Sequence, residues 1–223
     1  MQIAELRING FRGVENAKLR FSSHNVLIGP NNSGKTTVIE ALALLFGRDR
    51  LIRDLTEHDF FGSDPGPADR VSIVATITGF SNDDPNVNTA WFREERAVPK
   101  WWDPADGSLH AERADQSYRL ACQIGLAARF DRDDLAVEVI RYFHDDDDVG
   151  DVFDAEVVKR IPPQIIMTQN FVSKTRWEQI APTRGINCFV NGQGAQIPRR
   201  RDDWMSLGAR SSAESRIHRF ATA

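Results

Sequence analysis

Short apolar runs separated by polar turns predict a hairpin, a short strand and a helix in the first 47 residues. Residues 3–8 and 17–21 favour two strands around the turn-like sequence NGFRGVEN. Residues 25–28 form a third apolar run, which leads into a loop of Gly, Pro, Asn and Ser. A helix is expected over residues 35–46, where apolar side chains cover more than one stripe and therefore indicate a largely buried element. Gly47 is expected to end this helix as its C′ residue.

Three longer strands are expected further along the chain. The segment RVSIVATITGF carries alternating apolar residues at Val71, Ile73, Ala75 and Ile77. The segments YRLACQIGLAARF and LAVEVIRYF also favour strands, joined by the turn-like sequence DRDD. A polar connection with room for a short helix, and with a Pro-Gly-Pro loop, lies between the first helix and these strands. This order of elements predicts an α/β fold with an antiparallel lobe attached to its core.

The pattern weakens beyond about residue 166, where QIIMTQNFV is the last segment that favours a strand. We therefore expect a folded head region over residues 1–170 and a basic, poorly patterned tail over residues 171–223. Residues 174–223 hold nine Lys and Arg against four Asp and Glu, a net charge of +5. Because the net charge of the whole chain is −4, the other residues carry a net charge of −9. The tail therefore differs from the rest of the chain in the sign of its net charge.

The composition excludes several classes of protein. With 223 residues, 41% hydrophobic and 27% charged, the chain resembles an ordinary soluble protein of one large or two small domains. No apolar run approaches 18 residues, so we expect no membrane span, and the N-terminus lacks the apolar region of a secretory signal. Cys122 and Cys188 lie far apart without a CxxC motif, which favours reduced thiols and a cytoplasmic location.

The loop between the third apolar run and the helix is the strongest chemical signal in the chain. Residues 29–36, GPNNSGKT, match the phosphate-binding pattern GxxxxGK[ST] at every fixed position. Backbone N–H groups must curl around a phosphate, so Gly29 and Gly34 occupy positions where a side chain would block the curl. The helix N-terminus adds partial positive charge, Lys35 can reach the β- and γ-phosphates, and the Thr36 hydroxyl is the expected Mg²⁺ ligand.

The segments LRINGFRGVENAKLRF and NVLIGPNNSGKTTVIEALALLFG resemble the N-terminus of SMC/RecF-like ATPases. More narrowly they resemble the OLD (overcoming lysogenization defect) family of ATP-dependent endonucleases. The resemblance is specific over residues 1–47 and extends to about residue 160, including LTEHDFF and FHDDDDVGDVFD. It implies the N-terminal part of an ABC/SMC-type P-loop NTPase head with an antiparallel lobe. It also implies ATP and Mg²⁺ as cofactors, DNA as a partner, and a homodimer or a dimer with a homologous head around ATP.

Site residues carry over from this resemblance by position. The residues implied for phosphate and Mg²⁺ binding are Gly29, Asn31, Asn32, Ser33, Gly34, Lys35, Thr36 and Thr37. Arg12 and Phe11 match a strand-to-turn segment near the nucleotide, where Arg12 would approach a phosphate or the adenine. The alternatives are a solvated turn arginine and an ordinary core phenylalanine.

The remaining parts of a catalytic ATPase head are not visible in the sequence. The segment LAVEVIRYFHDDDD is the one Walker-B-like candidate, but it has the pattern of a half-exposed strand rather than a buried parallel one. Asp145 to Asp148 favour a solvated acidic loop over a metal site. Gln169 matches the glutamine that faces Mg²⁺ in ABC-type heads, with a polar strand end as the alternative. VNGQGAQI favours an ordinary turn over a signature segment, and no Toprim-like segment stands out.

Three functional hypotheses follow. The first is nucleotide binding with little turnover, by part of an OLD-like head whose catalytic residues are unknown. The second is a non-catalytic half-head that regulates a complete homologue, and the third is a small-molecule P-loop kinase, which would lack an antiparallel lobe. The basic tail either contacts the DNA backbone or marks a truncated or frame-shifted family member, and we favour the latter.

Overall fold

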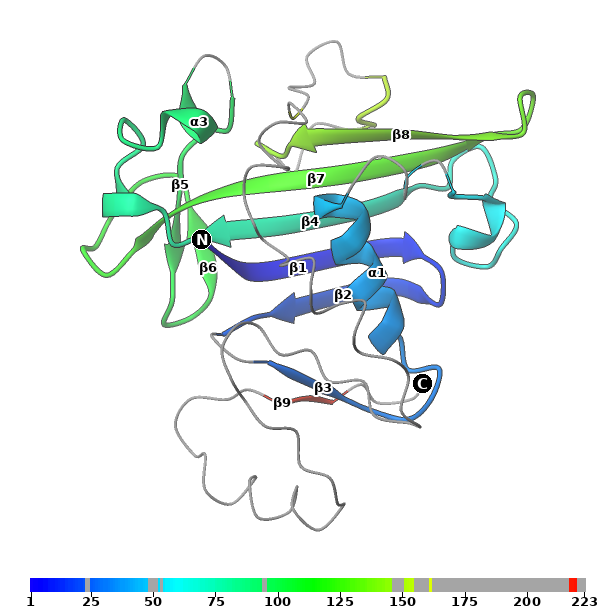
Figure 1. Ribbon diagram of the computed structural model, residues 1–223, viewed down its shortest axis with the longest axis horizontal. Coiled ribbons are helices and arrows are strands. Elements are labelled where there is room, and N and C mark those ends of the chain that lie inside the picture. The colour runs from blue at the N-terminus through cyan, green and yellow to red at the C-terminus, as the bar shows by residue number, and fades with distance from the viewer. Residues whose placement is uncertain are drawn as a thin grey trace.

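The computed structural model describes residues 1–22, 25–47, 52, 54–93, 96–145, 151–154 and 161, and the backbone of residues 217–219. The largest unit is a sheet of seven strands: β1 (Gln2–Phe11), β2 (Val14–Arg20), β4 (Val71–Thr78), β5 (Lys100–Asp103), β6 (Ser108–His110), β7 (Arg119–Asp131) and β8 (Ala136–Phe143). Their spatial order is β2-β1-β4-β7-β5-β6, with β8 also paired to β7 (Figure 1). Each of these pairs is antiparallel, which confirms the predicted antiparallel lobe.

The strands β1, β2, β4, β7 and β8 lie where the sequence pattern predicts them, whereas β5 and β6 were not predicted. The strand β4 is more deeply buried than its alternation suggests. Val71, Ile73, Ala75 and Ile77 share one face, and all of them are buried. Thr76 on the opposite face is also buried, because its hydroxyl accepts a hydrogen bond from the Gln123 side chain of β7 at 3.3 Å. A polar residue can therefore occupy the covered centre of a sheet when a neighbouring strand satisfies it.

The helix α1 (Lys35–Phe46) packs across one face of the sheet (Figure 1). Its apolar side chains meet alternate residues of β1, β4 and β7, which makes one continuous core; the helix contributes Val38, Ala41, Leu42, Leu44, Leu45 and Phe46. The helix ends at Phe46, and the N–H of Gly47 donates to the Ala43 carbonyl at 2.7 Å. Gly47 has φ −83°, so the helix ends without the left-handed conformation that a C′ glycine usually adopts.

The remaining elements are short. They are β3 (Val26–Ile28), the 3₁₀ turns η1 (Glu57–Asp59) and η2 (Ser81–Asp83), the short helix α3 (Thr89–Phe92) and β9 (Ile217–Arg219). The strand β3 pairs in parallel with β9, apart from the main sheet. In the described part of the chain, no helix has both the length and the apolar character needed to cross a membrane.

The structure tests the fold hypotheses unevenly. The β4, β7 and β8 strands pair antiparallel between residues 71 and 143, which argues against the small-molecule kinase alternative. Of the predicted α/β core, the described residues contain β3, α1 and the parallel β3–β9 pair, so its full sheet stays a prediction. The boundary near residue 170 and most of the tail over 171–223 lie outside the described residues.

Candidate nucleotide site

The predicted phosphate loop connects the end of β3 to the start of α1. Before the loop, Asn25 is buried and exchanges two hydrogen bonds with the Ser22 backbone, at 3.0 and 2.9 Å. These bonds fix where the chain leaves β2 and enters β3. Because α1 begins at Lys35, the loop residues lie between a strand and a helix N-terminus, as the mechanism of phosphate binding requires.

Both glycines of the motif lie close to a neighbouring side chain. A Cβ on Gly29 would lie 2.6 Å from the Ser33 hydroxyl oxygen, so the Ser33 side chain would have to move. Gly34 has φ +78°, and a Cβ there would also lie 3.1 Å from the Val14 side chain of β2. The loop therefore packs against the β1–β2 turn, and the left-handed backbone at Gly34 disfavours any residue with a Cβ at that position.

Lys35 occupies the centre of the loop. Its ammonium donates to the Gly29 and Pro30 carbonyls and to the Ser33 hydroxyl, with distances of 2.9 Å to Gly29 O and 3.2 Å to Ser33 Oγ. The residue is only 6% exposed, so the cation is buried. In the described part of the chain, these three oxygen partners of the ammonium are uncharged, whereas a buried charge is ordinarily paired with an opposite one.

The first turn of α1 presents groups that suit an anion and a hard cation. No side chain caps the helix, and its first turn contains no acidic residue. Its leading N–H groups therefore lack the side-chain acceptor that usually satisfies such donors. The Thr36 side chain faces outward and is exposed, whereas Thr37 is buried, which makes Thr36 the more accessible hydroxyl for a metal ion.

The β1–β2 turn lies beside the loop and is held by an ion-pair network. Arg12, with φ +50°, pairs through its guanidinium with Glu40 of α1 and with Asp59 of η1, where the Nε–Oδ1 distance is 2.7 Å. Burial lowers the pKa of Arg12, but the hydrogen bonds to Asp59 and Glu40 outweigh this and raise that pKa above its ordinary value. Arg12 therefore stays charged and ties three elements together.

Sequence reasoning did not single out Glu40 or Asp59. The signal for Asp59 was present in LTEHDFF, where Thr56 and Asp59 form a reciprocal capping box around η1. Phe11 is fully buried, and its backbone forms a bridge with Phe60. The proposed contacts of Arg12 and Phe11 with a nucleotide stay predictions, because in this structure Arg12 faces carboxylates and Phe11 faces the core.

The Walker-B-like segment forms β8, which runs antiparallel to β7. Its acidic residue, Glu138, accepts a hydrogen bond from Arg129 at 2.5 Å on the strand pair itself. Asp145 at the start of the acidic run accepts from the Val98 N–H at 2.9 Å. Neither carboxylate is directed to the phosphate loop by these contacts. Asp146–Asp148, Gln169 and the segment VNGQGAQI lie outside the described residues.

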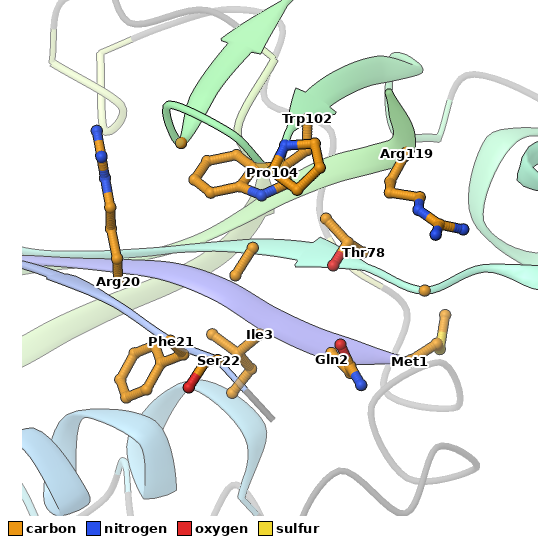
Figure 2. A pocket seen from close by; sticks show the side chains of 13 residues that line it. Met1, Gln2, Ile3, Arg20, Phe21, Ser22, Thr78, Trp102, Pro104 and Arg119 are labelled. Atoms are coloured by element: carbon orange, nitrogen blue, oxygen red, sulfur yellow. The ribbon is translucent and has the colours of Figure 1, made fainter. Parts of the chain in front are cut away.

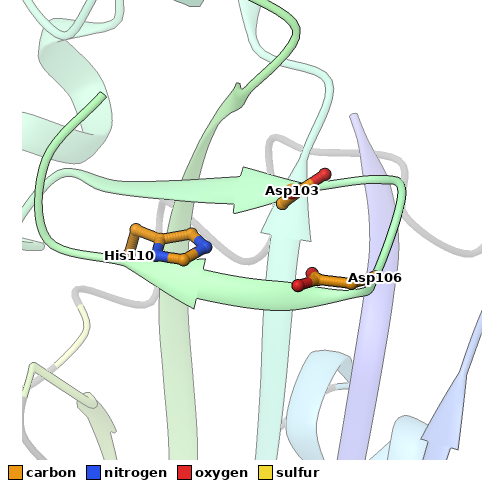
Figure 3. Close-up of side chains that lie close together, drawn as sticks. All are labelled: Asp103, Asp106 and His110. Atoms are coloured by element: carbon orange, nitrogen blue, oxygen red, sulfur yellow. The ribbon is translucent and has the colours of Figure 1, made fainter. Parts of the chain in front are cut away.

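A separate cluster of metal-ligating side chains lies on the β5–β6 hairpin. One ligand atom each of Asp103, Asp106 and His110 lies within 4.8 Å of the others (Figure 3). The His110 ring nitrogen is 2.6 Å from the Ser108 hydroxyl, and the hydrogen bond between Asp106 and Ser108 lowers the pKa of Asp106. Since these contacts stabilise the hairpin and none reaches the loop, the cluster does not belong to the nucleotide site.

Comparison of the sequence with known proteins identifies a family. A model described as an AAA ATPase domain matches residues 1–151. Three curated relatives are the DNA replication and repair proteins RecF of Erwinia tasmaniensis, Yersinia enterocolitica and Aliivibrio salmonicida. The first two are 46% identical to this chain over 56 residues, which are 25% of this chain and 15% of the relative. The third is 48% identical over 46 residues, which are 20% of this chain and 13% of the relative.

The similarity to RecF is thus strong but short, and the matched stretch covers about one seventh of the length of those proteins. The match to the AAA ATPase domain is broader, because it includes the antiparallel sheet, the phosphate loop and α1. It covers well over half of the residues. This chain therefore belongs to the AAA ATPase domain family.

Proposed function

We propose that the loop from Gly29 to Thr36 binds ATP, or another purine nucleoside triphosphate, together with Mg²⁺. The observation that carries the proposal is the buried Lys35 ammonium, which lies at an uncapped helix N-terminus among neutral oxygens. A bound triphosphate would supply an oppositely charged partner for this cation, whose three oxygen partners are neutral. Family membership supports the proposal, since the matched domain is an ATPase domain.

Each group of the loop then has a distinct role. Lys35 leaves the Gly29 and Pro30 carbonyls and turns to the β- and γ-phosphates, while the backbone N–H groups up to Lys35 surround the phosphate. Thr36 would hold Mg²⁺ through its exposed hydroxyl. The ion would neutralise part of the negative charge of the phosphates. The oxygen donor of Thr36 and the absence of a soft ligand among Asn31, Asn32 and Ser33 fit this cation.

The biological setting that we propose is DNA processing. The support is the short but strong similarity to proteins named as DNA replication and repair proteins. The narrower proposal, from the sequence resemblance, is an OLD-like head whose ATP binding is coupled to DNA cleavage elsewhere in the complete family architecture. Two such heads would enclose ATP between them, so a homodimer or a dimer with a homologous head belongs to this proposal.

We propose that this chain alone turns ATP over slowly or not at all. In the described part of the chain, two carboxylates contact the β1–β2 turn beside the phosphate loop, those of Glu40 and Asp59. Both bind the Arg12 guanidinium. Neither is placed to orient an attacking water while it neutralises that guanidinium. The same observation favours the second candidate function, a non-catalytic half-head that binds nucleotide and regulates a complete homologue.

Titration calorimetry with ATP, with and without Mg²⁺, tests the binding proposal on the purified chain. Lys35→Ala should weaken ATP binding at least tenfold, because it removes the cation that meets the β- and γ-phosphates. Thr36→Ala should remove most of the effect of Mg²⁺ on affinity. Lys18→Ala is the matched control, because Lys18 of β2 pairs with Glu5 of β1 and lies outside the loop.

The result that contradicts the proposal is ATP binding that is equal in the wild type, Lys35→Ala and Lys18→Ala. Release of phosphate from ATP at ordinary enzymatic rates, abolished by Lys35→Ala, would contradict the low-turnover proposal while leaving the binding proposal intact. Co-purification with a full-length relative distinguishes the two candidate functions. A regulatory half-head requires such a complex, whereas a head that acts as a homodimer does not.

A further inference from the structure

A cavity of about 550 Å³ lies at the end of the sheet opposite the β1–β2 turn. The start of β1, the residues after β2 and the end of β4 form one side, and the β5–β6 hairpin folds over the other (Figure 2). Near this position β1 has a register shift between Ile3 and Glu5, which changes the direction of the side chains before it. The volume lies in the range of cavities that hold one small organic ligand.

Two arginines line this cavity from different strands. Arg20 at the end of β2 and Arg119 at the start of β7 extend on opposite sides of it (Figure 2). All residues that line the cavity are in the described part of the chain, and none of them is Asp or Glu. The lining therefore contributes two guanidinium groups and no carboxylate, and guanidinium groups have the planar donor geometry that suits phosphate.

Nearby contacts hold the two guanidinium groups at the rim. Arg20 donates from Nη1 to the Asp106 carbonyl at 2.5 Å, and its Nε is 3.7 Å from Glu5. Arg119 has Nη1 at 3.6 Å from an Asp83 oxygen. An arginine carries five N–H donors, so such contacts can orient the group while it also binds a ligand.

The wall between the arginines is apolar and partly aromatic. Trp102 and Pro104 of the hairpin lie above the β1 and β4 ends in Figure 2, and Ile3 and Phe21 complete the apolar lining. Gln2 and Thr78 add polar groups able to bind ring or sugar atoms. A flat, partly apolar ring with an attached phosphate matches this combination of groups.

We propose that this cavity binds a single nucleotide unit, with its phosphate held by Arg119, the more exposed of the two arginines, and its base against Trp102 and Pro104 on the side of Arg20. The unit is either a free nucleoside monophosphate or the terminal nucleotide of a single strand, which share this chemistry. The proposal does not depend on ATP binding at the phosphate loop.

The cavity is a separate site from the phosphate loop. Gly34 of the loop packs against Val14 at the beginning of β2, whereas Arg20 is at its end. Seven strand residues separated by about 3.3 Å each place the two sites roughly 20 Å apart. One nucleotide cannot reach both sites, so variants of each can be tested independently.

The experiment measures binding of AMP, and of a 5′-phosphorylated tetrathymidylate, to the full chain in a Lys35→Ala background. Calorimetry should detect at least one of these probes, and the double change Arg20→Gln with Arg119→Gln should weaken it about tenfold or more. Arg113→Gln is the matched control, because its guanidinium stacks 4.8 Å from the Trp101 ring on the same lobe but does not line the cavity. Binding of AMP identifies a free mononucleotide as sufficient, and binding of the oligonucleotide alone identifies a strand end.

Arg119→Gln alone is a second variant, chosen because the Arg119 side chain is 65% exposed and its removal should leave the fold intact. It should weaken the same probe severalfold. The proposal is overturned if neither probe binds in the Lys35→Ala background. It is equally overturned if the probe binds with unchanged affinity to Arg119→Gln and to a folded double variant, as judged by circular dichroism.

Discussion

The Arg141 guanidinium on β8 binds the Leu44 carbonyl in the last turn of α1, with Nε 3.0 Å from the oxygen. A second nitrogen of the same guanidinium contacts this carbonyl as well. The contact joins the edge of the antiparallel sheet to the C-terminal end of the helix that begins at the phosphate loop. A cation at this end of a helix also interacts favourably with the helix dipole.

Replacing Arg141 should loosen this connection. Arg141→Ala removes a charge-assisted hydrogen bond to a partly buried carbonyl and should lower the free energy of unfolding by about 1–2 kcal/mol. Arg141→Lys keeps the charge but loses the paired donors, so it should cost less. Urea denaturation of the three proteins measures the difference, and an unchanged unfolding free energy in Arg141→Ala would show that the contact does not stabilise the fold.

Gly125 on β7 lies directly opposite Tyr142 on β8, and a Cβ at this position would be 2.6 Å from the tyrosine ring. Gly125→Ala should therefore destabilise the protein by about 1–3 kcal/mol, because the ring or the strand must move. The cost should be smaller in a Tyr142→Ala background. Gly13→Ala is the control, since a Cβ there meets nothing within 4 Å. Thermal denaturation of the wild type, the two glycine variants, Tyr142→Ala and the Gly125→Ala/Tyr142→Ala double variant checks this, and equal losses at both glycines would contradict it.

Cys122 is fully buried on β7, and its burial raises the pKa of the thiol well above the ordinary value. Because the thiolate is the reactive form, Cys122 in the native protein should react with Ellman's reagent orders of magnitude more slowly than a free thiol. A Cys188→Ser background isolates its signal. The thiol should become fully reactive in denaturant, whereas rapid stoichiometric reaction in native buffer would exclude the buried position.

Asp151 forms two hydrogen bonds with Arg70, at 2.8 and 2.6 Å, and the Arg70 contact lowers the pKa of Asp151 below its ordinary value of 3.8. Its stabilising contribution should therefore be complete above about pH 5 and should disappear as the pH falls through the lowered pKa. Asp151→Asn should lose up to about 1 kcal/mol at pH 7, and this difference from the wild type should shrink below pH 3.

Chemical denaturation at the two pH values measures this effect of Asp151. Asp154→Asn serves as the control, because that carboxylate is 75% exposed and lies 3.7 Å from Arg129. A loss that is the same at pH 7 and below pH 3 would mean that the effect of Asp151→Asn does not arise from its charge.

The local elements follow from the sequence because their signals are short-range. Apolar runs bounded by turn residues, with clear alternation in β4, predicted β1, β2, β4, β7 and β8, whereas the short strands β5 and β6 were not predicted. The apolar helix after the GxxxxGK[ST] motif was predicted over the residues that α1 occupies. Two features were not predictable in this way. Gly47 ends α1 in an extended conformation, and Asp59 reaches Arg12 across 47 positions of the chain.

The sequence alone determined the phosphate loop, since the required glycines, lysine and threonine lie within eight consecutive residues. It also determined the antiparallel lobe, because alternation and turn residues act between neighbours. The tertiary structure decided which distant residues come together: Arg12 with Glu40 and Asp59, Arg141 with the Leu44 carbonyl, and Arg20 and Arg119 on opposite sides of one cavity. Such pairs depend on strand order and helix placement, which are set by the burial of the whole core rather than by any local pattern.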